Sequence, residues 1–569
     1  VLYKRNPNPY DGEPLYNLAL TLRYQGMLHE AYEWFWKAAW SYAWRSAALY
    51  QAACISVKEG RFEDALEEIN SSLACNSRNH KVLALKATML RLAGRKDEAL
   101  SVCQKSKQLD LFNYGCRYEE YLLTGDKAVL DDLINLMHKQ FNNYDELALD
   151  YWRCGQNEVA ADIWQLADDN GATTAMTYYY MGLAGKEEGF DLGAKACSDY
   201  CFPNRLEAIL ALQAAIDHNA EDAKAHYYLG TLYYGARQYD VAREHWLRSA
   251  ELDPTFPTVW RNLALEEFNK ENNPEQAVAD MEKAFSLNTR DSRILMELDQ
   301  LYKRLGYDHD MRLKHLEQYP ELIAQRDDLL LEEITLLNLT GHYEQAKEKL
   351  DVHQFHPWEG GEGKVSGQYQ LSRVELARQA LDRKDFDAAI QLLNECLVYP
   401  PHLGEGKLYG AQENDFYYFL GCAYDAKGEM EKARECWEKA TLGPTEPAAA
   451  MYYNDAKPDK IFYQGLALLK LGRIGEAHGR FYKLLNYGKN HLFDHVVMDY
   501  FAVSLPDLQI WEGNLDQANR VHCNYMLALG YYGLHDETHS MKHLALATQL
   551  DPNHLGIYQF RTFINPSVI

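Results

Sequence analysis

A repeat of 34 residues constrains the fold of this chain more than any other feature. Gly26, Gly60 and Gly94 lie 34 positions apart, and each is followed five positions later by an alanine and then by a large apolar residue. A turn glycine accepts the left-handed backbone conformation that ends one helix, and a small alanine lets a neighbouring helix approach closely. Because one such unit cannot bury its apolar face alone, the period predicts stacked pairs of antiparallel helices.

Later segments repeat this pattern. The best preserved are HYYLGTLYYGARQYDVAREHWLRSAELDP at 226–254 and YYFLGCAYDAKGEMEKARECWEKA at 417–440. Their length and residue types resemble the tetratricopeptide repeat, a helix–turn–helix unit of 34 residues. We expect about a dozen units, and the period-2 alternation typical of half-buried strands is nowhere sustained. The sequence therefore predicts an all-α fold, a right-handed superhelical solenoid of tetratricopeptide-like helix pairs.

Interruptions of the repeat suggest how the chain is organised. Residues 168–205 are rich in Gly and Tyr and are expected to form an atypical helical insert. Long connections between helices are expected at 351–370 and 398–415, and insertions of this kind usually lie on one face of a solenoid. The predicted organisation is an N-terminal array (1–167), a middle array that carries the insert (168–350) and a C-terminal array with the long connections (351–569).

The net charge disfavours some classes of binding partner, and the cysteine pattern indicates the cellular compartment. The 83 acidic and 58 basic side chains give a net charge of −25, which repels nucleic acid and anionic membrane surfaces. The 11 cysteines are scattered singly, as in a cytoplasmic protein with reduced thiols. No apolar run reaches the roughly 18 residues that a membrane span requires. The chain begins at Val1 without a signal-peptide pattern, and we expect it to be a fragment of a longer protein.

Two of the long connections share the tetrapeptide GEGK, at 361–364 and 404–407. They lie 43 positions apart, about one enlarged repeat, so both are expected to emerge from the same edge of the solenoid. Their aromatic, carboxylate and ammonium groups could hold a sugar or a peptide. The competing interpretation is a pair of elongated helix connections in which lysine and glutamate pair locally. The predicted binding residues are His356, Trp358, Glu359, Glu362, Lys364, His402, Glu405 and Lys407.

Other patterns carry no chemistry that the sequence can specify. The histidines at 535, 539 and 543, and those at 491 and 495, are spaced four apart, as zinc ligands on a helix can be. His535 lies in a predicted turn and no further helix partner or Cys is apparent, so no metal site is predicted. Neither a Gly-x-Ser-x-Gly elbow nor a dinucleotide-binding Gly-x-Gly-x-x-Gly is present, so no catalytic residue and no cofactor is predicted. The aromatic runs at 34–44 and 177–181 are expected to pack between repeats, with Trp36 and Trp40, or Trp40 and Trp44, on one helical face. A Lys/Arg/Asn clamp for acidic peptide termini is not laid out on the first helices.

Longer stretches carry a second resemblance: RNPNPYDGEPLYNLAL and GMLHEAYEWFWKAAW near the start, HPWEGGEGK, HLGEGK, and NDAKPDKIFYQGLALLKLG at 454–472. Through them nearly the whole chain resembles the C-terminal repeat half of a bacterial family of large proteins. In that family a domain of unknown function, with a galactose-mutarotase-like β-sandwich, precedes a tetratricopeptide array. The resemblance implies a carbohydrate-related context, in which the array packs on or supports a sugar-handling domain.

The predicted function is a non-catalytic scaffold that mediates protein–protein or interdomain contacts. Its expected partner is a protein or peptide, a preceding domain of the same protein, or a glycan. The alternative is the accessory half of a carbohydrate-active enzyme, with Trp358 and either Glu362 or Glu405 facing a sugar site formed by the loops across 351–415. A third possibility is structural spacing alone, for which substitutions in these loops would change nothing.

Overall fold

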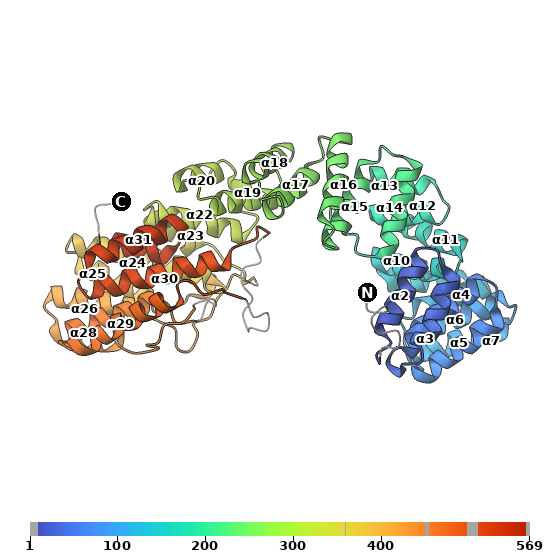
Figure 1. Ribbon diagram of the computed structural model, residues 1–569, viewed down its shortest axis with the longest axis horizontal. Helices are drawn as coiled ribbons and strands as arrows, with labels where there is room; N and C mark the ends of the chain where they lie inside the picture. Colours follow the sequence, from blue (N-terminus) through green and yellow to red (C-terminus); the bar gives the residue numbers. More distant parts are fainter. Residues whose placement is uncertain (1–9, 359, 450–454, 498–509, 565–569) are drawn as a thin grey trace. The chain divides into compact units, whose positions relative to one another are not determined.

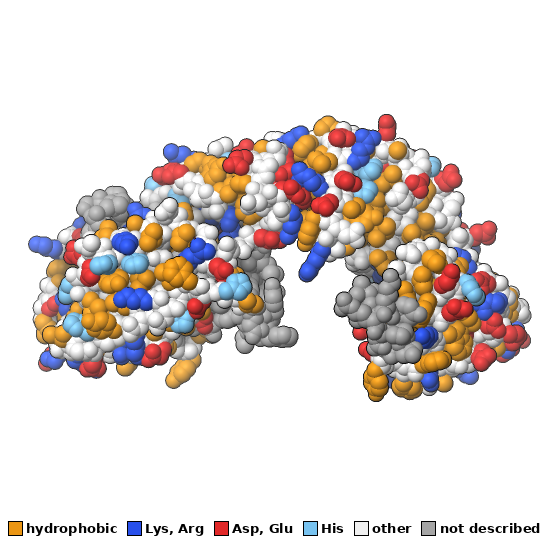
Figure 2. Space-filling model, viewed as in Figure 1, with side chains coloured by type: hydrophobic (Ala, Val, Ile, Leu, Met, Phe, Trp, Pro, Cys, Tyr) orange, Lys and Arg blue, Asp and Glu red, His pale blue; other side chains and the backbone are white. Residues whose placement is uncertain are grey.

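The computed structural model describes residues 10–358, 360–449, 455–497 and 510–564, and the secondary structure of these residues is helical without any strand (Figure 1). The predicted all-α fold is therefore confirmed. The chain divides into two compact units, Val1–Thr255 and Phe256–Ile569. On the face shown in Figure 2, acidic and basic side chains are interspersed within each unit.

The first unit consists of consecutive antiparallel helix pairs. Its helices are α2 (Glu13–Tyr24), α3 (Leu28–Ala38), α4 (Tyr42–Lys58), α5 (Phe62–Cys75), α6 (His80–Leu92), α7 (Lys96–Leu109), α8 (Tyr114–Thr124), α9 (Lys127–Met137), α10 (Phe141–Arg153), α11 (Asn157–Asp169), α12 (Ala175–Leu183), α13 (Glu188–Lys195), α14 (Leu206–His218), α15 (Ala223–Gly235) and α16 (Tyr239–Leu252). The two short helices α12 and α13 lie where the sequence suggested an atypical insert.

The second unit continues the same arrangement. Its helices are α17 (Pro257–Asn269), α18 (Pro274–Leu287), α19 (Ser292–Arg304), α20 (His309–Leu316), α21 (Pro320–Ile323), α22 (Asp327–Leu339), α23 (Tyr343–Val352), α24 (Lys364–Asp382), α25 (Phe386–Glu395), the 3-10 turn η1 (Pro401–Leu403), α26 (Asn414–Lys427), α27 (Met430–Ala440), α28 (Pro458–Lys470), α29 (Ile474–His491), α30 (Leu515–Gly533), α31 (Glu537–Leu550) and α32 (Leu555–Ile564).

The repeated small residues have the structural roles that the sequence predicts. The turn glycines Gly26, Gly60 and Gly94 have φ of 81°, 73° and 75°, in the left-handed region that a side chain disfavours. The alanines that follow them are fully buried at Ala31, Ala65 and Ala99. Small residues at these positions therefore let the two helices of each pair pack closely.

The first helices of the pairs line the inner side of unit 1. Helices α4 and α10 contact each other although α6 and α8 lie between them in the chain, so the array curves tightly around that side. The hydroxyl of Tyr24 on α2 also donates a 2.7 Å hydrogen bond to Glu207 on α14. The first pair of the unit thus contacts a helix that follows much later in the chain.

Unit 2 also brings distant segments together. The indole Nε1 of Trp511, which lies between α29 and α30, donates a 2.9 Å hydrogen bond to the carbonyl oxygen of Glu297 on α19. Asn553, in the connection before α32, donates to the carbonyl oxygen of Lys303 at 3.0 Å and accepts from Arg312 at 3.1 Å. These contacts hold the last helices of the chain against α19 and α20.

One aromatic prediction is wrong. The sequence predicts that Trp40 shares a helical face with Trp36 or with Trp44. However, α3 ends at Ala38 and α4 begins at Tyr42, so Trp40 lies in the turn between them and is 78% exposed. The run at 177–181 does pack in the core, where Tyr179 and Tyr180 are buried.

Candidate binding pocket on the inner side of unit 1

A pocket of about 290 Å³ opens between α4, α6, the start of α8 and α10. Its buried lining is mostly apolar and includes Leu85, Leu147, Tyr151 and Cys154. The rest of its lining is polar or aromatic and includes the exposed Lys81 and Phe112 and the half-buried Glu146 and Asp150. An apolar interior beneath a few polar groups is the usual composition of a ligand-binding pocket.

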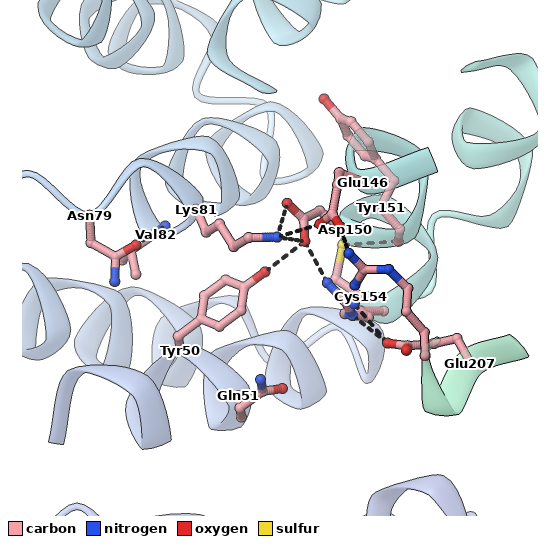
Figure 3. A network of polar contacts seen from close by, with 12 residues as sticks. Tyr50, Gln51, Asn79, Lys81, Val82, Glu146, Asp150, Tyr151, Cys154 and Glu207 are labelled. Carbon is pink, nitrogen blue, oxygen red and sulfur yellow. Dashed lines mark hydrogen bonds and ion pairs between the residues drawn. The ribbon is translucent and has the colours of Figure 1, made fainter. Parts of the chain in front are cut away.

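Lys81 and Asp150 form the central ion pair of this pocket (Figure 3). The Lys81 ammonium lies 2.7 Å from Oδ1 and 2.9 Å from Oδ2 of Asp150, and 3.5 Å from the Glu146 carboxylate. Arg153, one turn along α10, donates to Oδ1 of Asp150 at 2.7 Å. Since α10 presents Glu146, Asp150 and Arg153 three or four positions apart, one helical face supplies both signs of charge.

The pairing continues beyond the pocket to Glu207, which is nearly fully buried (Figure 3). Arg153 Nη2 lies 2.7 Å from its carboxylate, and the Tyr24 hydroxyl also donates to it. Burial would raise the pKa of Glu207, but Arg153 and Tyr24 outweigh this effect and the pKa is lowered. Burial and the nearby Glu207 raise the pKa of Tyr24 to about 12. Glu207 is thus ionised and Tyr24 is a hydrogen-bond donor at neutral pH.

A second buried network lies behind the pocket, around the fully buried Glu119 of α8. This carboxylate accepts hydrogen bonds from Tyr151 at 2.9 Å, Thr88 at 2.8 Å and Arg91 at 2.7 Å. Burial and the charge of Glu119 raise the pKa of Tyr151 well above its usual value. The Tyr151 ring therefore lines the pocket as a neutral surface that is fixed from behind.

Two further groups bear on what the pocket can do. Burial raises the pKa of the Cys154 thiol well above its usual value, so this cysteine is not a thiolate nucleophile. His80 pairs through Nε2 with Asp110 at 3.2 Å, whereas its Nδ1 is buried and has no hydrogen-bond partner among the described residues. A buried polar atom without a partner is uncommon in folded proteins.

The structure brings the two GEGK segments together in unit 2, as their spacing predicts. The backbone N–H of Phe355 donates to the carbonyl oxygen of His402 at 2.8 Å. A Cβ on Gly404 would lie 2.7 Å from the carbonyl oxygen of Phe355, so only glycine fits this contact. Glu405 reaches the start of α24, where it accepts from Ser366 Oγ at 2.6 Å and from the Val365 N–H at 3.3 Å. One segment thereby caps the helix that follows the other.

The remaining predicted binding residues are spread around these segments. His356 is exposed and contacts Asp327, with Nδ1 3.2 Å from Oδ2. The Trp358 indole packs against the hydrophobic core and lies where a Cβ of Gly361 would be, 2.3 Å from Cε2. Lys407 donates to the Leu397 carbonyl oxygen at 2.9 Å and pairs with Glu413 at 2.5 Å. Glu362 is exposed, Lys364 and His402 are half-buried, and Glu359 lies outside the described residues. The binding role predicted for this set stays a prediction.

The unit 1 pocket was not found from the sequence. Its residues come from four helices, and only the cluster on α10 left a local signal, the i, i+4, i+7 spacing of Glu146, Asp150 and Arg153. In a chain with 83 acidic side chains that spacing does not stand out. The pairing of Lys81 with Asp150 depends on the curvature of the array.

Comparison with known proteins identifies the repeat. Family models described as tetratricopeptide repeat match residues 223–256 and 415–442. Among solved structures, yeast Tom70 is 14% identical over 74% of this chain and 96% of its own, with a TM-score of 0.24. YrrB, described as a TPR protein with an unusual peptide-binding site, is 17% identical over 40% of this chain and 95% of its own, with a TM-score of 0.17. MamA is 19% identical over 36% of this chain and 96% of its own, with a TM-score of 0.17.

These structural likenesses are too low to transfer any property to this chain. Among the described residues, no helix combines the length and the apolar character that crossing a membrane requires. The family matches fall on the pair α15–α16 and on the pair α26–α27, one in each unit. The chain is therefore an all-helical solenoid that carries tetratricopeptide repeats.

Proposed function

We propose that the chain is a non-catalytic scaffold for protein–protein contacts, and that the unit 1 pocket is one of its binding sites. The observation that carries this assignment is the largely apolar lining of Leu85, Leu147 and Tyr151 in a pocket of about 290 Å³. A ligand that covers this apolar lining would remove it from water. Tetratricopeptide repeats, which interact with peptide segments through such surfaces, support the same class of function.

The dimensions of the pocket favour a polypeptide segment. A volume of about 290 Å³ lies at the lower end of ligand sites, enough for one large side chain and part of its backbone. Lys81 pairs with Asp150 and Glu146, and Arg205 also pairs with Glu146, so a charged ligand would have to break existing pairs. The ligand that fits is a peptide with one apolar or aromatic anchor residue. Phe112, 56% exposed at the pocket, would be covered by the flanking residues of that peptide.

A phage-displayed random peptide library, selected against the full chain, tests this proposal. The selected peptides are expected to share an apolar anchor, and Phe112→Ala should weaken their binding about tenfold. Leu109→Ala is the matched control, because Leu109 is 52% exposed nearby and does not line the pocket. If no peptides were selected, or if the wild type and Phe112→Ala bound them equally, the unit 1 pocket would not be a peptide-binding site.

A carbohydrate-related role for the GEGK segments is the second candidate. It is favoured by the backbone contact between Phe355 and His402, which brings the segment that carries exposed His356 and Glu362 beside the segment that carries exposed Lys407. The test is a glycan array probed with the wild type and with Glu362→Gln. Binding of a glycan that the substitution reduces supports the role. Binding that is absent, or equal in both proteins, excludes Glu362 from it.

A further inference from the structure

The last helix of the chain, α32, covers the inner side of unit 2. The ring of Phe560 lies 5.6 Å from that of Phe462 on α28 and 5.5 Å from that of Tyr532 on α30. The ring of Phe563 lies 6.2 Å from that of Phe419 on α26 and 6.0 Å from that of Tyr463 on α28. One short helix thus contacts the first helices of three consecutive pairs.

A polar contact extends the covered surface to α24. Arg378 Nη1 donates to Thr562 Oγ1 at 2.8 Å and to both oxygens of Glu375 at 2.7 Å. At the other end of α32, the hydroxyls of Tyr558 and Tyr343 are 2.5 Å apart. The contact surface of α32 is therefore a stripe of apolar and hydroxyl-bearing side chains, whereas Arg561 points away and is exposed.

The surface beneath α32 differs from an ordinary core because it is charged. Glu375 and Asp415 are nearly fully buried there. Each has its own cation within unit 2: Arg378 pairs with Glu375 at 2.7 Å, and Lys460 pairs with Asp415 at 2.5 Å. Neither carboxylate depends on α32 for its counter-ion. Departure of α32 would therefore expose apolar surface but would not leave a buried charge without its counter-ion. A buried unpaired charge is the costliest consequence of losing a packed helix.

We propose that the inner side of unit 2 is a receptor for an amphipathic helix and that α32 occupies it as a displaceable internal ligand. The partner that fits has the α32 pattern: an aliphatic residue, an aromatic residue three positions later, and a second aromatic residue three positions after that, as in Ile557, Phe560 and Phe563. Binding of an apolar helix face in a groove is a common mode of peptide recognition. Because α32 is tethered, a partner must compete with its high local concentration, so the site is masked in the isolated chain.

Hydrogen exchange of the 569-residue chain is the first test. Amides of α32 are expected to exchange at least about tenfold faster than those of α28 and α30, because α32 leaves the surface without unfolding the unit. Adding excess synthetic peptide DPNHLGIYQFRTFI (551–564) should speed exchange in α32 further. Exchange of α32 at the same slow rate as α28 would overturn the proposal.

A chain that ends at His554 is the second test. It is expected to keep its helical circular dichroism and to bind the fluorescein-labelled peptide at least about tenfold more tightly than the intact chain does. In the peptide, Phe560→Ala should abolish binding and Arg561→Ala, at the exposed position, should not change it. Unfolding of the shortened chain, or a folded shortened chain that does not bind the peptide, would refute the idea. Dimerisation of the intact chain through exchanged α32 helices would assign the site to a second copy instead. Phe112→Ala in unit 1 should leave all these results unchanged.

Discussion

Tyr24 and Glu207, 183 positions apart in the chain, are joined by a 2.7 Å hydrogen bond between the phenol hydroxyl and a buried carboxylate. Arg153 lies against the same carboxylate at 2.7 Å. The three side chains come from α2, α10 and α14. This contact therefore connects the beginning, the middle and a late helix of unit 1.

Substitutions at this contact should differ in cost. Tyr24→Phe removes one hydrogen bond and leaves the Arg153–Glu207 pair, so about 1 kcal/mol of unfolding free energy should be lost. Glu207→Ala leaves the mostly buried Arg153 without this partner and should cost about 3 kcal/mol. Urea denaturation measures both. Glu33→Ala, at a position where the side chain is 67% exposed, is the control and should be within experimental error of the wild type. Equal losses for Tyr24→Phe and Glu207→Ala would contradict this ranking.

Asp145 should make unit 1 less stable as the pH rises. It is buried and accepts from Trp164 Nε1 at 3.0 Å and Thr177 Oγ1 at 3.3 Å, and burial raises its pKa from 3.8 to about 7. Between these two values the folded state holds a proton that the unfolded state has lost, so stability falls with rising pH. Asp145→Asn should remove this dependence and stabilise the protein near pH 8 by about 2 kcal/mol.

The measurement for Asp145 is the thermal midpoint of unfolding across that pH range. Asp162→Asn, which alters a carboxylate that is 68% exposed, should keep the wild-type slope. If the thermal midpoint of Asp145→Asn fell with rising pH as steeply as that of the wild type, groups other than Asp145 would cause the pH dependence.

Two glycines of α15 should respond in opposite directions to the same substitution. A Cβ on Gly230 would lie 2.4 Å from Cδ1 of the buried Trp246, so Gly230→Ala should cost about 1–3 kcal/mol through overpacking. A Cβ on Gly235 would meet nothing within 4 Å, so Gly235→Ala should stabilise the helix by up to about 1 kcal/mol. Urea denaturation of the two variants compares them directly. If both substitutions changed the unfolding free energy in the same direction, helix propensity rather than the contact with Trp246 would dominate.

Trp511 should contribute strongly to the stability of unit 2, because it joins the segment before α30 to α17 and α19. It is 1% exposed, packs edge-to-face on Phe268 at 5.4 Å and donates to the Glu297 carbonyl oxygen. Trp511→Ala should cost about 3–5 kcal/mol, and Trp511→Phe less. Trp40→Ala is a matched control, because this tryptophan is 78% exposed. The measurement is denaturation followed by tryptophan fluorescence and circular dichroism, and comparable losses for Trp511→Ala and Trp40→Ala would be inconsistent with the structure.

Substitutions of the two GEGK glutamates, Glu362 and Glu405, should differ in their effect on stability. Glu405 caps α24, so Glu405→Ala should lower stability by about 1–2 kcal/mol. Glu362 is exposed, so Glu362→Ala should leave the thermal midpoint unchanged. Differential scanning calorimetry of the two variants decides the matter. A large loss in Glu362→Ala would show a structural role that its position does not predict.

The repeating unit can be predicted from the amino-acid sequence alone. The 34-residue spacing of Gly26, Gly60 and Gly94 sufficed, because the left-handed turn and the close contact at the following alanine are local requirements within one helix pair. The proximity of the two GEGK segments followed from the same logic, since positions one repeat apart recur at the same edge.

Which repeats contact one another cannot be predicted from the sequence and depends on the three-dimensional fold. The Lys81–Asp150 pair, the Tyr24–Glu207 hydrogen bond and the position of α32 join residues from different repeats. Such contacts depend on the curvature of the array, which accumulates from small rotations between successive pairs and leaves no period in the sequence. The same limit applies to Trp358, whose indole packs over Gly361 instead of facing solvent, because available space rather than residue type determines where a ring lies.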